Sequence, residues 1–218
     1  SMIEHFFDIQ KLGSATLFDG FKISKYQDFC NEHQNKYPVI NITLKDIKAV
    51  DWQNCFKKIK MVIVELYSKH NYLLKSDKID ELDKEKYKQI MLEEASQAKF
   101  EFSLFNLSDY LQKHYGKKTI ILVDEYDAPI IAAFNNTNAP IKSEDKENKT
   151  YYEKVIDFMQ TFLGKPYKGN DALHKGMLTG VMRLGRESIF SEWNNFDVFG
   201  IIKKEISTDH HAPVCFRL

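Results

Sequence analysis

The alternation of apolar and polar residues along the chain predicts an α/β protein. Short apolar runs within residues 37–44, 118–124 and 177–181 are rich in the β-branched and aliphatic residues that favour strands. Unbroken runs of this kind are typical of parallel strands that are covered by helices on both faces. Apolar residues recur with helical spacing in four other segments: 2–9, 51–70, 103–115 and 152–163.

Capping and turn residues mark where these helices should begin and end. Asp51 is a suitable N-cap for the second helix, and Ser103 for the third. Gly116 should end the third helix, because glycine adopts the left-handed conformation common at helix ends. The run Gly164-Lys165-Pro166 should end the fourth helix.

Two polar segments interrupt this pattern. Residues 75–99 carry closely spaced charges of both signs, which predicts a solvated helical insertion with ion pairs at i, i+4 spacing. Residues 135–150 are rich in Asn, Lys and Glu, and we expect a mobile loop there.

Composition narrows the function classes. The 218 residues suit one domain, and 31 basic and 31 acidic residues give zero net charge, so there is no strong nucleic-acid signal and no general attraction to anionic membranes. No apolar run is long enough to span a bilayer. Cys30, Cys55 and Cys215 contain no CxxC spacing and indicate reduced thiols. We therefore expect a cytoplasmic protein, with export by a signal-less secretion system left open.

The candidate chemistry lies where the apolar run 120–123 meets Asp124 and Glu125. A buried strand that ends in Asp-Glu has the Walker B pattern, in which the Asp holds Mg²⁺ and the Glu deprotonates the attacking water. In open α/β sheets, ligands bind at the carboxyl ends of strands, where these two carboxylates should emerge. The alternative is a buried strand whose acidic residues only begin a loop.

Longer motifs favour the first interpretation. The string ILVDEYDAPI at 121–130 resembles a segment of the bacterial AAA-ATPase-like family, which comprises P-loop NTPases usually followed by a PD-(D/E)XK nuclease domain. Further segments resemble the same family in the same order, and they lie at 1–8, 179–183, 188–195 and 199–205. The resemblance implies a P-loop NTPase-like (ASCE/AAA-like) parallel sheet flanked by helices.

The resemblance also implies roles for individual residues. Asp124 would bind the metal and cofactor, and Glu125 would be catalytic. Thr179 would be the sensor hydroxyl on the neighbouring strand, although it can also be read as an ordinary strand threonine. Arg183 would neutralise transferred charge, although it can also be a surface arginine. Asp127 is expected to cap or brace the turn before Pro129 rather than to bind metal.

One part of the family pattern is missing from these residues. No GxxxxGK(S/T) occurs, since Gly116-Lys117 and Gly164-Lys165 both lack the required hydroxyl afterwards. We therefore expect an incomplete AAA-ATPase-like domain over 1–206, truncated at its N-terminal strand, with no ATP or Mg²⁺ bound as it stands. Such a chain would be a binding or regulatory module with an unknown protein partner. The alternative is a fragment of an active ATPase whose phosphate loop lies upstream.

The last expectations concern the end of the chain. Residues 207–218 should be a disordered tail, because His210, His211 and Cys215 match no metal-site spacing. No PD…(D/E)xK set is present, so nuclease activity is not expected. Without an N-terminal strand, the edge of 177–181 needs a cover. Residues 196–202 should supply that cover as a strand, or a second copy should pair there in a homodimer.

Overall fold

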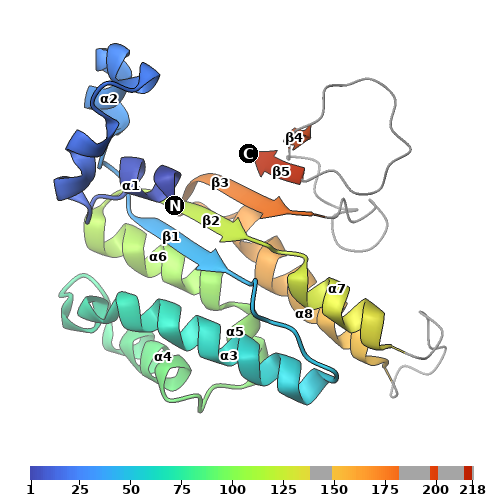
Figure 1. Ribbon diagram of the computed structural model, residues 1–218. Coiled ribbons are helices and arrows are strands. Elements are labelled where there is room, and N and C mark those ends of the chain that lie inside the picture. The colour runs from blue at the N-terminus through green and yellow to red at the C-terminus, as the bar shows by residue number, and fades with distance from the viewer. Residues whose placement is uncertain (138–148, 182–196, 201–213, 218) are drawn as a thin grey trace.

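The computed structural model describes residues 1–137, 149–181, 197–200 and 214–217, the last two ranges as backbone only. Its centre is a parallel sheet of three strands, β1 (Val39–Thr43), β2 (Thr119–Asp124) and β3 (Leu173–Gly180), shown in Figure 1. The predicted α/β class and all three predicted strands are therefore confirmed. β2 lies in the middle, so its carboxyl end has a neighbouring strand on each side.

The far side of β3 is covered, but not by the expected strand. β5 (Val214–Arg217) pairs with β3 in antiparallel orientation, and β4 (Asp197–Gly200) pairs with the outer side of β5. Residues 197–200 thus form a strand as expected, one position further out than expected. The expectation of a disordered tail is wrong for residues 214–217, since the unpaired backbone groups of β3 offer them a hydrogen-bonded ladder. The same pairing occupies the edge that a homodimer was expected to use.

One face of the sheet holds the main core. Ile121 and Val123 of β2 point into it, together with Ile40 and Leu178 from the two neighbouring strands. The helices that cover this face are α3 (Trp52–Lys69), α6 (Ser103–Tyr115), α7 (Ala128–Asn136) and α8 (Tyr151–Tyr167) (Figure 1). No helix in the described ranges is long and apolar enough to cross a bilayer.

The opposite face carries a much smaller cluster, because the alternate residues Ile120 and Leu122 of β2 pack there with Val39. Its cover is the N-terminal segment, in which Ile3 and Phe7 contact this cluster. The segment comprises α1 (Met2–Phe7), η1 (Leu12–Phe18), η2 (Lys22–Lys25) and α2 (Gln27–His33). The sheet is therefore thickly covered on one face and thinly covered on the other.

The helix-end predictions have mixed outcomes. The Asp51 carboxylate accepts a hydrogen bond from the Asn54 amide at 2.8 Å, and Gly116 ends α6 with φ of 66°, so both predictions are confirmed. Ser103 is not a cap: it lies inside α6 and donates to the Phe100 carbonyl instead. α8 does not stop at Gly164 but runs to Tyr167, whose buried hydroxyl donates to the Ile121 carbonyl at 3.3 Å. Burial of this ring offsets the hydrogen bond that Pro166 removes.

The charged segment 75–99 contains the last residue of η3 (Asn71–Lys75), all of α4 (Glu81–Met91) and the start of α5 (Gln97–Glu101), so its helical prediction holds. Its ion pairs within α4 are at i, i+3 spacing rather than i, i+4. Tyr87 and Ile90 are 2% and 4% exposed and belong to the main core. The charges therefore form the outer face of a helix that packs on the domain. The expected loop at 135–150 lies mostly outside the described residues.

Candidate functional site

Asp124 and Thr179 meet at the carboxyl ends of two adjacent strands. The register that pairs Val123 with Leu178 brings the next residue of each strand to the same edge. The Thr179 hydroxyl donates a hydrogen bond to Asp124 Oδ1, and the Glu125 amide donates to the same oxygen at 3.1 Å. Two donors on one oxygen hold the carboxylate in a fixed orientation. The predicted placement of Thr179 on the strand beside Asp124 is confirmed, while the two residues' chemical roles stay predictions.

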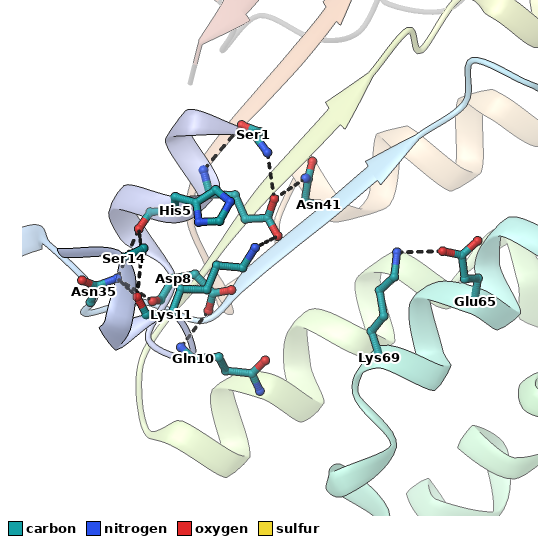
Figure 2. Close-up of polar contacts among 11 residues, drawn as sticks. Ser1, His5, Asp8, Gln10, Lys11, Ser14, Asn35, Asn41, Glu65 and Lys69 are labelled. Atoms are coloured by element: carbon teal, nitrogen blue, oxygen red, sulfur yellow. Dashed lines mark hydrogen bonds and ion pairs between the residues drawn. The ribbon is translucent and has the colours of Figure 1, made fainter. Parts of the chain in front are cut away.

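These two side chains border a cleft of about 630 Å³. The cleft extends around the β1 edge of the sheet: Leu122 and Met177 line it from the thinly covered face, beside Ile3 of α1, and main-core residues line it on the other side. One wall is α3, where Lys69 and Glu65 form an i, i+4 ion pair at 2.9 Å (Figure 2). The cleft is therefore bounded by the sheet, α1 and α3, and it is lined by both apolar and polar residues.

The wall between α1 and β1 is fixed by a carboxylate network (Figure 2). Glu4 accepts hydrogen bonds from Asn41 Nδ2 at 2.6 Å, Lys11 Nζ at 2.8 Å and the Ser1 ammonium group at 3.0 Å. Burial raises the pKa of Glu4, but the hydrogen bonds from Lys11, the terminal ammonium and Asn41 outweigh this effect and lower it to about 2. The Asn41 amide is thereby held at the cleft.

Sequence analysis did not identify Asn41 as a site residue. The signal was present, since Asn41 is a polar residue within the otherwise apolar stretch of β1. Its partner Glu4 lies 37 residues away in the sequence, so the pairing itself was not visible in the local pattern.

The turn after Asp124 is bonded tightly to the end of β3. The Tyr126 amide donates to the Thr179 carbonyl at 3.1 Å, and the Val181 amide donates to Asp127 Oδ2 at 2.9 Å. Asp127 is 1% exposed and does not cap α7 with its side chain. The expectation that Asp127 braces the turn is confirmed, with β3 as the element that it braces. These bonds keep Thr179 beside Asp124.

Glu125 faces a different hollow from its neighbour. It adopts a left-handed backbone conformation with φ of 49°, which is uncommon for a residue with a side chain. It lines a second hollow of about 550 Å³, together with Lys48, Ala128 and Val181, whereas Asp124 lines the first. The structure thus brings Asp124 and Thr179 together and leaves Glu125 apart from them. Arg183, the remaining predicted site residue, lies outside the described residues.

The donor set suits one kind of metal ion. Within the described ranges, no group of three or more His, Cys, Asp or Glu side chains is arranged to hold a metal. Asp124 offers one carboxylate in contact with the Thr179 hydroxyl, and Asp46 also lines the cleft. Mg²⁺ is commonly held in this way, by one or two carboxylates, several waters and the phosphates of a substrate. The residues present fit Mg²⁺ bound together with a nucleotide, and they do not form an ion site without one.

The chain is similar to a known protein family. A family model described as a predicted AAA-ATPase, AAA-ATPase-like, matches residues 1–190. The match spans α1, the cleft and all three parallel strands. The chain matches none of the curated proteins and none of the solved structures with which it was compared.

Proposed function

Because this chain belongs to the AAA-ATPase-like family, we propose that Asp124 and Thr179 form the metal-positioning half of an ATP site. We further propose that the 218 residues alone neither bind nor hydrolyse ATP appreciably and serve as a binding or regulatory module. The observation that carries the proposal is the hydrogen bond from Thr179 to Asp124 at the edge of the cleft.

The geometry suggests how these residues would work. Bound Mg²⁺ would neutralise charge on the phosphate oxygens. The Asp124 carboxylate is already oriented by two donors, so it needs little reorganisation to accept the ion. The Thr179 hydroxyl has one proton, and its acceptors are Asp124 and, at 3.5 Å, the Val123 carbonyl. A sensor role requires this proton to turn to a phosphate oxygen. Glu125 would be the residue that activates water, and it lines the second hollow rather than this cleft.

The proposed inactivity follows from the missing phosphate loop. Such a loop wraps backbone N–H groups around the β-phosphate and adds a lysine and a hydroxyl. Neither Gly-Lys pair of this sequence substitutes for it. Gly116 ends α6 before β2 begins, at the opposite edge of the sheet from Asp124, and Gly164 lies inside α8. One comparable oxyanion donor stabilises the transition state by about 3 kcal/mol in other enzymes, so the loss of several should remove most of the catalytic power.

Titration calorimetry with Mg·ATP tests this proposal directly. We expect no measurable heat of binding at micromolar protein and up to millimolar nucleotide, and no phosphate release above that of buffer. The Asp124→Asn variant should behave identically. Micromolar binding by the unaltered chain, lost in Asp124→Asn, would contradict the proposed inactivity while supporting the assigned metal position.

A second candidate is a part of an active ATPase whose phosphate loop is supplied by upstream sequence. It is favoured by the position of Ser1 and Ile3, which line the same cleft as Asp124 and Thr179. A protein extended by the upstream reading frame should then hydrolyse ATP, and Asp124→Asn in that longer protein should abolish turnover. An extended protein that still fails to bind Mg·ATP would exclude this candidate.

The proposal also covers the protein's partner and its location in the cell. A regulatory module acts through a partner, so we propose an unidentified protein partner. The free thiols of Cys30 and Cys55 support the cytoplasmic location inferred from the sequence.

A further inference from the structure

The fold collects positive charge at the edge of the sheet where the parallel strands begin. Exposed lysines lie in the segments that lead into β1, β2 and β3 and at the start of β3. They are here called the basic edge: Lys36, Lys117, Lys118, Lys168 and Lys175. The acidic residues in the same segments are Asp28, Glu32 and Asp171. Because the whole chain has zero net charge, this excess is produced by the topology and is invisible in the composition.

A row of aromatic rings lies at the same edge. The rings of Tyr37 and His174 stack with centroids 4.3 Å apart and planes 14° apart. His33 stacks on Tyr37 at 5.9 Å, and its Nδ1 lies 2.9 Å from the Tyr37 hydroxyl. Phe29 continues the row at 4.5 Å from His33. These four residues are here called the aromatic column. At one end Phe29 stacks on the buried ring of Phe6 at 6.0 Å, and at the other end His174 is exposed.

The basic edge and the aromatic column adjoin one another. Pro38, which follows Tyr37, accepts a backbone hydrogen bond from Ile120, so the segments that enter β1 and β2 lie side by side. Burial lowers the pKa of His174, and the positive charges of Lys175, His33 and Lys118 lower it further. Lysines of two strands therefore act electrostatically on one ring of the column.

We propose that the basic edge and the aromatic column together form a binding surface for single-stranded nucleic acid. The lysines would contact phosphates, and an unpaired base would stack on the outer face of His174. Surfaces that bind single strands without sequence preference combine these two features. The surface lies at the opposite edge of the sheet from Asp124, so this inference does not depend on the proposed ATP site.

The aromatic rings indicate which kind of polyanion this surface would bind. Double-stranded nucleic acid keeps its bases stacked internally and offers mainly phosphates to a protein surface. An acidic peptide would use the lysines and leave the exposed rings unused. Only a strand with accessible bases uses both features, because every base has a face that can stack on an aromatic ring.

Fluorescence anisotropy with a labelled 20-nucleotide oligothymidylate tests the role of the lysines. We expect the double variant Lys117→Glu/Lys118→Glu to bind more than tenfold more weakly than the unaltered chain at 50 mM salt. Its slope of log affinity against log salt should be shallower by about 1.4, which is roughly 0.7 for each lost single-strand contact. The control Lys57→Glu/Lys154→Glu changes net charge equally on α3 and α8, and it should bind like the unaltered chain.

The variant His174→Ala tests the role of the rings. Stacking on an aromatic ring contributes about 5- to 150-fold in affinity per base, so we expect a loss in this range with an unchanged salt slope. His174→Tyr should restore binding, and thermal unfolding should show that each variant is folded. The proposal is overturned if the unaltered chain fails to bind at 50 mM salt or if the control pair weakens binding equally. It is also overturned if duplex or polyglutamate binds as tightly and His174→Ala has no effect.

Discussion

Replacing Gly180 with alanine should lower the free energy of unfolding by about 3 kcal/mol, at the upper end of the range for overpacked sites. A Cβ at this position would lie 2.5 Å from Tyr126 Cε1 and 2.9 Å from Asp127 Oδ1. Both residues are buried, with exposed fractions of 0% and 1%, so neither has open space into which it can move. Urea unfolding followed by circular dichroism gives the difference in free energy between Gly180→Ala and the unaltered chain.

Gly13→Ala is the matched control for this prediction. A Cβ at Gly13 would meet no atom within 4 Å, and the residue is not among those with positive φ, so we expect a change below about 0.5 kcal/mol. Equal unfolding midpoints for Gly180→Ala and the unaltered chain would show that the turn after Asp124 is not packed against β3 as described.

Acidification should remove about 3 kcal/mol of stability through His70 alone. This side chain is 7% exposed and its Nδ1 lies 3.1 Å from the Tyr72 hydroxyl. Burial, helped by the charge of Lys69, lowers its pKa from 6.5 to about 4. The unfolded chain therefore takes up a proton at a higher pH than the folded chain does. The contribution of His70 to the free energy of unfolding is fully present above pH 6.5 and is lost as the pH falls to 4. The magnitude follows from about 1.4 kcal/mol for each unit of pKa difference.

The variant His70→Gln keeps a polar side chain that does not titrate. Its free energy of unfolding should change less with pH than that of the unaltered chain between pH 6.5 and 4.5. Glu4 does not contribute to the change in this pH range. Its pKa in the folded state is about 2, so its contribution to stability is lost between pH 4.5 and 2. Parallel pH profiles for the two proteins would refute the buried neutral state of His70.

The features that sequence predicted correctly are those set by local pattern. The apolar run before Asp124 marked a central strand, and a parallel sheet then requires its carboxyl end to adjoin that of β3. The contact between Asp124 and Thr179 follows from this rule, although the two residues are far apart in the chain. The caps at Asp51 and Gly116 were equally visible, because each depends on one residue's own conformational preference.

The features that sequence did not predict arise from packing between distant segments. Tyr167 carries α8 past Pro166 because its ring is buried against β2, and no local signal reports that burial. β5 joins the sheet because β3 offers it backbone partners, which its own four residues do not reveal. Glu125 has a left-handed conformation at the end of β2 and lines the second hollow, whereas the Asp-Glu motif alone places both carboxylates in one site.

The parallel sheet also sets the order in which the candidate site can form during folding. Val39 pairs with Ile120, and Leu122 pairs with Met177, so each pairing closes a long loop of chain. Helices such as α3 and α6 need only local contacts, whereas pairings between distant residues form late and slowly. The contact between Asp124 and Thr179 depends on the second of these closures. A partly folded chain can therefore contain most of its helices and still lack the site. During refolding, the helix content should reach its final value before the cleft has formed.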